Sequence, residues 1–420
     1  MNNTALKVYA LEACIFTLPL KSYSRERIRK WKSHALKLAV ISREESPPRN
    51  GVGDIEIDDL MDMQFSLQET MYGTEKAIET FLSGILDKLG VPAHKSVLIS
   101  NDPIIFRNTR KKEWAMLIGI RENGPGRSAL LESGCHIVVD GLDCIDIYNN
   151  SGKEPHFSQT IPNVFSDHSE MDTLLENRKP VFFFDYDGTL TPIVKDPDSA
   201  VLTDETRDLL SQLAQTHRVA VVSGRDMDVL REFIRLDGLI YAGSHGFRIS
   251  GPDGLHMEHE DAREYVKSMD DTEAKLRESL ENEIRGVKVE RKHYAIAVHY
   301  RNAPERAFKQ IENTLDQLVE NCPDYKIGKG KKVMELKPSL DWHKGRAVNW
   351  IMDQLHLSGA EDHVPVYLGD DITDEDAFRS LADDGIGIIV GDHGQPSAAR
   401  YRLENVEEVN QFLYRIIHSE

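Results

Sequence analysis

The chain has 420 residues, which predicts two or three domains at roughly 100–200 residues per domain. Hydrophobic residues make up 40% and charged residues 29%, a balance typical of globular proteins rather than disordered ones. The formal net charge of −19 argues against a nucleic-acid partner, because so acidic a surface repels a phosphate backbone. It does not exclude a small anionic substrate, which a local positive pocket can bind.

The cysteines form no C-x-x-C pair, which disfavours a zinc ribbon or a redox motif. They are Cys14, Cys135, Cys144 and Cys322. So few cysteines make no disulfide framework, and we expect a reducing, cytoplasmic compartment. No segment approaches the roughly 18 apolar residues of a membrane span, and no basic region precedes the apolar stretch 10–20 as in a signal peptide. We therefore expect no membrane partner.

The chain divides into blocks where the sequence pattern changes. Residues 1–165 form a first block, and residues 166–178 predict a linker. From residue 179 onward, strand, loop and helix patterns repeat, which predicts a parallel sheet with helices on both faces. We expect this α/β core to comprise residues 179–246 and 338–420.

The pattern changes between residues 247 and 337. Amphipathic helices are expected at 259–285 and 307–319, and alternation at 287–301 and 332–337 predicts strands. Helices and strands inserted in this way into a parallel core predict a small α/β lid.

Two aspartates follow the first apolar strand of the core. Asp185 and Asp187 stand two residues apart, so they share a face if the strand persists, or surround one point if it frays. The carboxyl end of a parallel strand is where α/β folds bind ligands. A carboxylate pair there suits phosphoryl transfer, in which one carboxylate attacks phosphorus and the other moves a proton. The alternative, a turn with solvated aspartates, is commoner for an isolated Asp-x-Asp.

A second core strand is followed by Ser223, Gly224 and Arg225. The hydroxyl and backbone N–H groups of this segment could hold a phosphate oxygen, although Ser-Gly is also ordinary turn chemistry. Lys344 precedes a predicted helix and could offset the negative charge of a nucleophile and a transferring phosphoryl group.

A third core strand ends in a dense acidic cluster. For Asp370 we favour a role in binding Mg²⁺, a hard cation that takes oxygen ligands. For Asp374, Glu375 and Asp376 we favour the alternative that they cap and charge the N-terminus of a helix.

The order of these motifs resembles that of the haloacid dehalogenase superfamily of phosphatases. The order is Asp-x-Asp-Gly-Thr, Ser-Gly-Arg, Lys-Gly and Gly-Asp-Asp, beginning at Asp185, Ser223, Lys344 and Gly369. Longer motifs are similar to those of the trehalose-6-phosphate phosphatases over roughly residues 178–415. They are Asp-Tyr-Asp-Gly-Thr-Leu-Thr-Pro-Ile, Ala-Gly-Ser-His-Gly from Ala242, Val-His-Tyr-Arg from Val298, Glu-Leu-Lys-Pro from Glu335, and Gly-Asp-Asp-Ile-Thr-Asp-Glu-Asp-Ala-Phe.

The resemblance implies a role for each matching residue. Asp185 would form an aspartyl-phosphate, and Asp187 would protonate the leaving sugar oxygen and then activate water. Ser223 and Lys344 would bind the phosphate. The implied Mg²⁺ ligands are Asp185, the backbone carbonyl of Asp187 and Asp370, with Asp371 and Asp374 in the outer shell or in contact through water.

The predicted lid has strands that alternate between an apolar and a polar face. Tyr294, Ile296, Val298 and Tyr300 should pack on the lid helices. The opposite face presents Glu290, His299, Arg301, Glu335 and Lys337, with Lys292 near the turn. Such a surface suits the hydroxyls of an uncharged disaccharide, and the lid of the family does hold the sugar. The alternative is a solvated face with cross-strand ion pairs.

Three core residues are expected near the mouth of the site. Arg225, His245 and Gly246 are the residues concerned, beside Gly224 of the phosphate loop.

The first block carries a weaker resemblance to the same superfamily. Segments 35–42, 77–102 and 133–142 are similar to strands and a helix of its β-phosphoglucomutase-like branch. The expected opening strand, residues 7–16, lacks an Asp-x-Asp. We therefore expect a degenerate, non-catalytic domain, of the kind that some trehalose-phosphate phosphatases carry. The alternative is an unrelated α/β or helical domain, and oligomerisation, regulation and docking to a synthase all stay open as its role.

The leading hypothesis is a Mg²⁺-dependent hydrolase that converts trehalose 6-phosphate to trehalose and phosphate. A phosphatase for another sugar phosphate, such as sucrose 6-phosphate, would use the same core and differ in the lid. A non-catalytic sugar-phosphate-binding regulator of a synthase is the alternative from another class. The complete set of Asp185, Asp187, Ser223, Lys344 and Asp370 argues against it.

Overall fold

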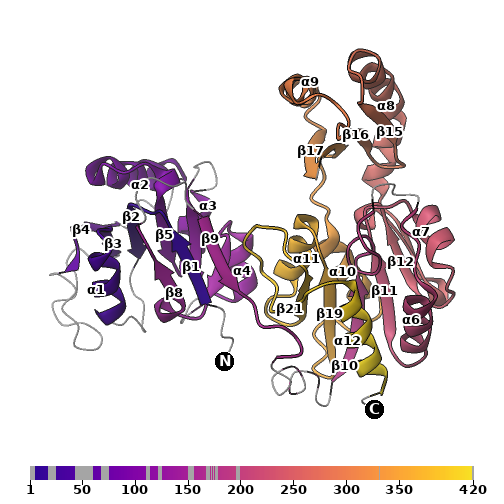
Figure 1. Ribbon diagram of the computed structural model, residues 1–420, viewed down its shortest axis with the longest axis horizontal. Coiled ribbons are helices and arrows are strands. Elements are labelled where there is room, and N and C mark those ends of the chain that lie inside the picture. The colour runs from indigo at the N-terminus through magenta and orange to yellow at the C-terminus, as the bar shows by residue number, and fades with distance from the viewer. Residues whose placement is uncertain are drawn as a thin grey trace. The chain divides into compact units, whose positions relative to one another are not determined.

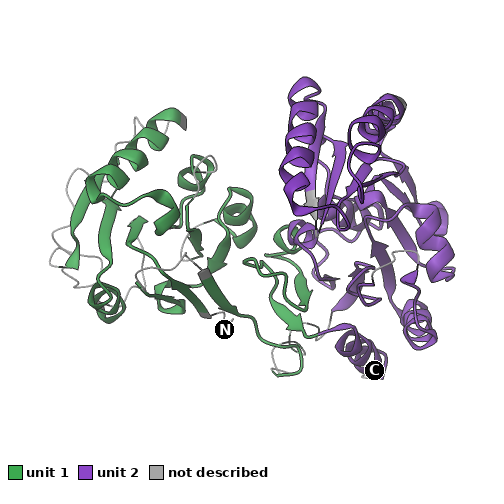
Figure 2. Cartoon of the chain, turned by 45° about the horizontal axis from the view of Figure 1, so that its top comes forward, with its two compact units in different colours: residues 1–176, 378–404 green, residues 177–377, 405–420 purple. Residues whose placement is uncertain are grey.

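The computed structural model describes residues 5–17, 25–42, 60–67, 75–109, 114–121, 125–149, 156–166, 171, 173, 175, 178–194, 199–330 and 332–418. The chain forms two compact units, coloured separately in Figure 2. The first unit comprises residues 1–176 and 378–404, and the second comprises residues 177–377 and 405–420. Most of the predicted linker, residues 166–178, lies outside the described residues.

The main sheet of the second unit is built on a buried parallel strand, β10 (Lys179–Phe184). Its last four residues are buried on both faces, as the apolar run predicts for the middle of a parallel sheet. Strands β11, β12 and β19 run parallel to it, while β13 and β14 continue the sheet antiparallel beyond β12. In spatial order the strands are β14 (His256–Glu258), β13 (Arg248–Ser250), β12 (Ile240–Gly243), β11 (Arg218–Val222), β10 and β19 (His363–Gly369).

Helices follow the parallel strands and cover this sheet (Figure 1). Their bounds are α6 (Asp204–Thr216), α7 (Met227–Ile234), α10 (Lys344–Gln354), α11 (Glu375–Ser380) and α12 (Val406–His418). Helices α6 and α12 are in contact, and the Thr206 hydroxyl donates a hydrogen bond to Asn410 across them (3.1 Å). The ring of Phe412 packs edge-on against Phe182 of β10. This apolar packing fixes the strand ends that carry the motifs.

A separate antiparallel sheet forms the cap of the second unit. Its strands are, in spatial order, β15 (Lys288–Arg291), β16 (Ile296–His299), β18 (Val333–Pro338) and β17 (Tyr325–Gly330). Two helices accompany it, α8 (Glu260–Leu276), which continues as one π-helical turn η8 (Arg277–Glu281), and α9 (Phe308–Asn321). Ile296 and Val298 lie in one buried cluster with Leu280, Ile311 and Leu315 of the helical segments. The predicted helices are therefore confirmed, and so is the packing of Ile296 and Val298 on them.

The cap begins later in the chain than the predicted boundary at residue 247. Residues 248–258 form β13 and β14, which belong to the main sheet. The turn at residues 251–254 brings these two strands together as a hairpin on the edge of β12. Tyr294 also differs from expectation, because it packs with Phe247 and Ala262 rather than with the main cap cluster.

The first unit contains a six-stranded, fully parallel sheet. In spatial order its strands are β4 (Met63–Ser66), β3 (Lys37–Ser42), β2 (Ala13–Thr17), β5 (Ser96–Ser100), β6 (Met116–Ile120) and β7 (Ile137–Val139). The helices are α1 (Arg25–Ser33), α2 (Glu75–Leu89), α3 (Pro103–Arg107) and α4 (Arg127–Glu132). A smaller sheet holds β8 (Ile145–Ile147), β1 (Ala5–Tyr9) and β9 (His156–Thr160).

The predicted single opening strand, residues 7–16, is wrong. It is two strands, β1 and β2, that belong to different sheets. Ala10 lies between them with φ at 60°, in the left-handed region, where an L-residue cannot continue a strand. The continuous apolar sequence therefore gives no sign that one strand ends and another begins here.

The register of β2 matches that of β10. Each strand lies between two parallel neighbours, and the residue that follows the paired phenylalanine is Thr17 in the first unit and Asp185 in the second. The paired residues are Val40, Phe16 and Ile99 around β2 and Val221, Phe184 and Leu368 around β10. Thr17 donates to or accepts from Ser100 at 2.7 Å. A neutral hydroxyl pair thus lies where the second unit has an acidic strand end.

Residues 378–404 cluster with the first unit, although the sequence predicts that residues 338–420 all belong to the core. Strands β20 (Ile386–Val390) and β21 (Tyr401–Leu403) form a parallel pair that follows β19 in the order of the main sheet, which agrees with the predicted core. The Asp383 carboxylate accepts hydrogen bonds from the backbone N–H groups of Arg127 (2.7 Å) and Ser128 (3.1 Å). These contacts cap the N-terminus of α4.

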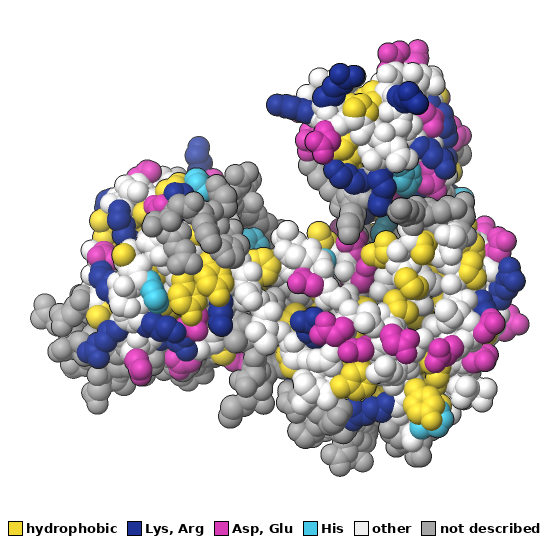
Figure 3. All heavy atoms as spheres, in the orientation of Figure 1, with side chains coloured by type: hydrophobic (Ala, Val, Ile, Leu, Met, Phe, Trp, Pro, Cys, Tyr) yellow, Lys and Arg dark blue, Asp and Glu magenta, His cyan; other side chains and the backbone are white. Residues whose placement is uncertain are grey.

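Within the described residues, no helix is both long and apolar enough to cross a bilayer. On the face shown in Figure 3, basic side chains are interspersed with acidic ones.

Candidate active site

The centre of the site is a buried ion pair at the end of β10. Asp185 is 5% exposed, and its backbone N–H donates to the Leu368 carbonyl of the neighbouring strand (2.8 Å). Lys344, the first residue of α10, places Nζ 2.7 Å from Oδ1 of Asp185 and 2.7 Å from Oδ1 of Asp374. Burial opposes the charged form of Lys344, but these carboxylates outweigh it and raise the pKa of the ammonium above its ordinary value. Lys344 is therefore a fixed positive charge beside Asp185.

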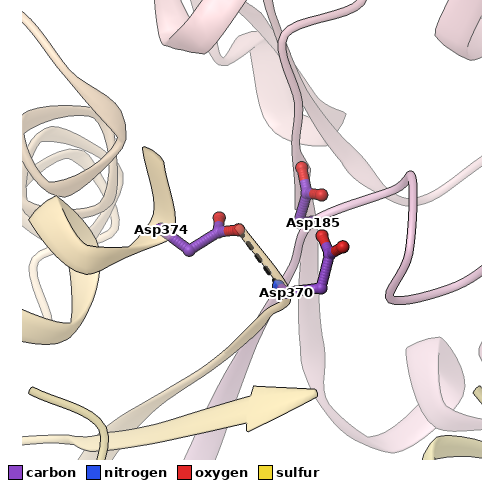
Figure 4. A group of neighbouring side chains, drawn as sticks. All are labelled: Asp185, Asp370 and Asp374. Atoms are coloured by element: carbon purple, nitrogen blue, oxygen red, sulfur yellow. Dashed lines mark hydrogen bonds between the residues drawn. The ribbon is translucent and has the colours of Figure 1, made fainter. Parts of the chain in front are cut away.

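Asp185 belongs to a cluster of three carboxylates. One oxygen each from Asp185, Asp370 and Asp374 lies within 4.8 Å of the others (Figure 4). Burial, together with the carboxylates of Asp185 and Asp374, raises the pKa of Asp370 to about 9. Burial raises the pKa of Asp185 to about 7, although Lys344 opposes it. One ammonium does not neutralise this cluster, so its chemistry fits a hard divalent cation.

Asp374 is a fully buried acceptor at the start of the helical turn after β19. Its Oδ1 accepts from the Lys344 ammonium and from the Tyr367 hydroxyl (2.6 Å). Its Oδ2 accepts from the backbone N–H group of Asp370 (3.1 Å; Figure 4). The same oxygen accepts from the backbone N–H group of Asp371 (3.0 Å). The prediction that Asp374 caps a helix start is confirmed, because its bond to the Asp371 N–H belongs to a capping box. The capping prediction does not include its second role, which is to join the loop after β19 to Lys344.

Asp187 lies at the edge of the site, with 42% of its side chain exposed. Arg225 binds both of its oxygens, with Nε 2.7 Å from Oδ2 and Nη2 2.6 Å from Oδ1. The guanidinium lies over the rings of Tyr186 and Phe233, 5.4 and 5.0 Å from their centroids. Cation–π contact and a bidentate pair together hold Arg225 in place. The sequence predicts Arg225 near the mouth of the site but not this partnership.

The loop after β11 is packed closely against a left-handed turn. Ser223 is 1% exposed, and its hydroxyl accepts from the backbone N–H of Arg225 (3.2 Å). A Cβ on Gly224 would lie 2.8 Å from Cε1 of His245, so only glycine fits there. His245 follows Ser244 and precedes Gly246, and all three have positive φ values of 52°, 58° and 91°. This strained turn aims the imidazole across the loop.

The cap contributes a charged group next to His245. Lys292 Nζ lies 2.5 Å from Oε1 of Glu335, and His245 Nε2 lies 3.6 Å from its Oε2. Burial opposes the charge of Glu335, but Lys292 and His245 hold the pKa of its carboxyl well below the ordinary range. Burial and the nearby Lys337 lower the pKa of His245 to about 4. A small pocket here is lined by Gly224, Ser244, His245, Phe247, Lys292, Tyr294, Ala295, Glu335 and Lys337.

The remaining predicted sugar-binding residues lie elsewhere on the cap. Strand register places Glu290, Ala297 and Glu335 in one row across the polar sheet face, so Glu290 and Glu335 share that face. His299 Nε2 lies 2.6 Å from Glu290 Oε2, and this pair does not line the pocket. Arg301 follows β16, is exposed and does not line the pocket either.

Two residues of the site are not predicted from the sequence. Tyr367 lies within the apolar strand β19 and has the pattern of a core residue. Asp226 accepts from the Ser244 hydroxyl (2.6 Å) and from the backbone N–H of His293 in the cap (3.0 Å). Its position next to Arg225 could have indicated it, but a lone aspartate before a helix also predicts an ordinary N-cap.

A parallel sheet whose strand ends carry Asp185, Ser223 and Asp370, with Lys344 at the start of helix α10, defines a protein of the haloacid dehalogenase fold class. A family model described as trehalose-phosphatase matches residues 183–407, which is more than half of the chain. The chain belongs to the trehalose-phosphatase family.

Two curated relatives show how far the similarity extends. A trehalose-phosphate phosphatase of Mycobacterium marinum is 35% identical over 347 residues, which cover 82% of this chain and 87% of that protein. One of Mycobacterium tuberculosis is 34% identical over 372 residues, covering 86% and 92%. Both alignments are longer than the core and cap together, so they reach into the first unit.

Other matches differ in length or show the fold alone. An uncharacterized glycosyl hydrolase of Mycobacterium tuberculosis is 36% identical over 334 residues, and the chain spans only 25% of its length. The solved C-terminal domain of C. albicans trehalose-6-phosphate phosphatase matches with a TM-score of 0.50 and 24% identity. That match covers 61% of this chain and 98% of the solved domain.

Proposed function

We propose that the protein hydrolyses trehalose 6-phosphate to trehalose and phosphate, with Mg²⁺ as cofactor and an aspartyl-phosphate intermediate. The observation that carries the proposal is the buried contact of Lys344 with Asp185, 2.7 Å at Oδ1. Membership of the trehalose-phosphatase family supports the substrate. The protonated lysine favours the charged form of the Asp185 carboxylate and can neutralise a phosphoryl group that bonds to it.

The first half-reaction transfers the phosphoryl group to the protein. The Asp185 carboxylate oxygen forms a bond to phosphorus as the bond between phosphorus and the sugar O6 breaks. The departing oxygen takes a proton from Asp187, which gives free trehalose. Water then attacks phosphorus as Asp187 takes one of its protons, and the Asp185–phosphorus bond breaks to release phosphate. The carboxylates return to their starting states, so the cycle balances.

Asp185, Asp370 and the backbone carbonyl of Asp187 are the groups that would hold Mg²⁺. The cation would supply positive charge against the non-bridging phosphate oxygens. The residues present fit it, because the clustered carboxylates are short of positive charge and their pKa values are raised accordingly. Asp374 would stay outside this ligand set, because its oxygens already have donors.

Arg225 controls the availability of Asp187 in this scheme. A bidentate arginine pair occupies both oxygens that could carry the transferred proton. We infer that substrate binding must draw Asp187 away from Arg225 before it can protonate the sugar oxygen.

We propose that the polar side chains around the small pocket beside His245 contact the sugar. Lys292, Glu335 and Lys337 offer both donors and acceptors to hydroxyl groups. Glu290, His299 and Arg301 lie outside this pocket, so we propose that they contact the more distant glucose ring or none. The contact between Asp226 and the cap shows that core and cap meet beside this pocket.

We propose that the first unit is a degenerate domain of the same fold class that performs no chemistry. Thr17 lies at the register position of Asp185, and a threonine hydroxyl beside Ser100 cannot provide the carboxylate nucleophile. The order of its parallel strands also supports this origin.

Phosphate release from a substrate panel tests the proposal. The panel holds trehalose 6-phosphate, sucrose 6-phosphate, glucose 6-phosphate and an aryl phosphate, each with Mg²⁺ and with EDTA. We expect Mg²⁺-dependent release from trehalose 6-phosphate well above the others. Release from sucrose 6-phosphate instead would overturn the cap assignment and keep the aspartate chemistry. No release from any substrate would favour a non-catalytic sugar-phosphate-binding protein.

A further inference from the structure

Tyr367 is buried in the middle of β19, with no exposed surface. Its backbone is paired with Phe183 of β10, and its hydroxyl donates to Oδ1 of Asp374 at 2.6 Å. Burial and the adjacent Asp374 carboxylate raise the pKa of this phenol well above its ordinary value. The hydroxyl therefore keeps its proton and acts as a permanent donor.

Asp374 has four donors for its two oxygens. Tyr367 and Lys344 donate to Oδ1, and the backbone N–H groups of Asp370 and Asp371 donate to Oδ2. An ionised carboxylate offers about four lone-pair sites, so this side chain has none left for a metal ion. A Cβ on Gly369 would lie 2.2 Å from Cγ of Asp374, so the packing around the carboxylate is equally tight. Asp374 is thus a structural link rather than a ligand.

We propose that Tyr367 is a positioning residue for phosphoryl transfer, acting through Asp374 on Lys344 and on the loop that carries Asp370. The inference rests on the proposed function. It adds a residue with no contact to substrate or metal, one that sets how the single Lys344 ammonium is divided between Asp374 and Asp185.

The direction of the effect follows from charge. With Tyr367 present, two donors share the negative charge on Oδ1 of Asp374, and Lys344 reaches Asp185 at an equal distance of 2.7 Å. Without the hydroxyl, Lys344 is the only donor to that oxygen among the residues that the structure describes. The ammonium is then drawn toward Asp374 and away from Asp185, and the loop after β19 loses one of its supports.

Tyr367→Phe removes only the hydroxyl and tests the inference. We expect kcat for trehalose 6-phosphate to fall about tenfold or more, and the Mg²⁺ affinity measured by calorimetry to weaken by about tenfold, as is typical when an outer-shell partner is lost. The KM for the sugar phosphate should change less than about twofold, because Tyr367 makes no contact with the pocket.

Tyr241→Phe is the matched control. Tyr241 lies in β12 of the same sheet, is 4% exposed and donates to the Leu236 carbonyl at 2.5 Å. We expect it to lose comparable stability and to keep both kcat and Mg²⁺ affinity. Equal kinetic losses in the two variants would mean a merely structural role and would overturn the inference.

A double-mutant cycle with Asp374→Asn tests the route of the effect. If Tyr367 acts through Asp374, then Tyr367→Phe should weaken Mg²⁺ binding no further in the Asp374→Asn background. Additive losses would overturn the inference. Should Tyr367→Phe not fold, Asp374→Asn alone must reproduce the loss in kcat and Mg²⁺ affinity at unchanged KM.

The wild-type chain separates this inference from the function on which it rests. Wild-type protein that releases no phosphate from trehalose 6-phosphate would overturn the proposed function and this inference with it. Wild-type activity together with wild-type kcat and Mg²⁺ affinity in Tyr367→Phe would overturn the inference alone.

Discussion

The ammonium of Lys344 lies 2.7 Å from Oδ1 of Asp185, and the exposed fractions of the two side chains are 3% and 7%. A pair buried this deeply is weakly screened by solvent, so the proposed nucleophile and its counter-charge behave as one unit. Because Lys344 also has Asp374, the loss of the Asp185 charge does not leave the ammonium unpaired. Chemistry and stability can therefore be separated at this position.

Asp185→Asn should lower kcat at least about 10⁴-fold, because an amide cannot form the acyl-phosphate bond. The melting temperature should stay close to that of the wild type, since Lys344 keeps one carboxylate. Phosphate release and a thermal melt measure the two effects. Asp353→Asn, at an exposed position of α10, serves as the control. Turnover near the wild-type rate in Asp185→Asn would contradict the covalent mechanism.

Glu335→Gln should raise the KM for trehalose 6-phosphate about tenfold, the effect of losing one charged hydrogen bond. An aryl phosphate, which has no sugar hydroxyls, should show little change. Glu320→Gln on the exposed side of α9 is the control and should alter neither substrate. Equal losses on both substrates would show that Glu335 supports the core chemistry rather than the sugar.

Gly188→Ala should abolish the response to Mg²⁺. The backbone of Gly188 has φ at +84°, and a Cβ there would lie 2.0 Å from Oδ2 of Asp370. Gly254→Ala is the matched control, because its φ is +78° but nothing lies within 4 Å of its added Cβ. The control should cost only about 1 kcal/mol of backbone strain. If calorimetry finds equal Mg²⁺ affinity in both variants, the present position of Asp370 is not required for Mg²⁺ binding.

The stabilisation by Mg²⁺ should increase with pH. The pKa of Asp370 is raised from 3.8 to about 9, so between these values the folded chain binds more protons than the unfolded chain. Metal-free stability from this group is complete below the lower value and is lost as the pH rises toward the upper one. Because Mg²⁺ must displace the proton, its affinity rises in the same direction.

Thermal melts with Mg²⁺ and with EDTA between about pH 6 and pH 9 measure this linkage. The difference in melting temperature should grow across the range in the wild type and should stay flat in Asp370→Asn. A difference that shrinks with increasing pH would contradict a protonated Asp370 in the metal-free chain.

Residues at strand ends are the part of the site that sequence reasoning places well. Asp185, Ser223 and Asp370 each end an apolar strand, and the carboxyl ends of parallel strands meet at one edge of the sheet. Lys344 follows the same logic at a helix start, and the structure brings it to Asp185 as expected. These inferences need only the period of the pattern and the direction of the strands.

Residues whose role depends on tertiary partners are beyond that reasoning. Tyr367 lies among apolar residues, so its sequence context is that of an ordinary core tyrosine. Only the structure shows that its hydroxyl donates to Asp374. Asp374 itself has the sequence context of a helix cap. Arg225 finds Asp187 across the site, 38 positions earlier in the chain. The break at Ala10 is missed for a local reason, because a left-handed alanine leaves no mark on hydrophobic periodicity.

The hydroxyl pair of Thr17 and Ser100 has a consequence for how the chain responds to chelation. Two neutral groups at 2.7 Å satisfy each other and require no cation. The second unit has clustered carboxylates at the corresponding strand ends, where the proposed function has Mg²⁺ bind. Removal of divalent ions should therefore loosen only one half of the molecule, and amide exchange near β10 and β19 should speed up while that near β2 and β5 stays slow. The two similar sheets thus differ in the ionic conditions under which their strands stay protected from local opening.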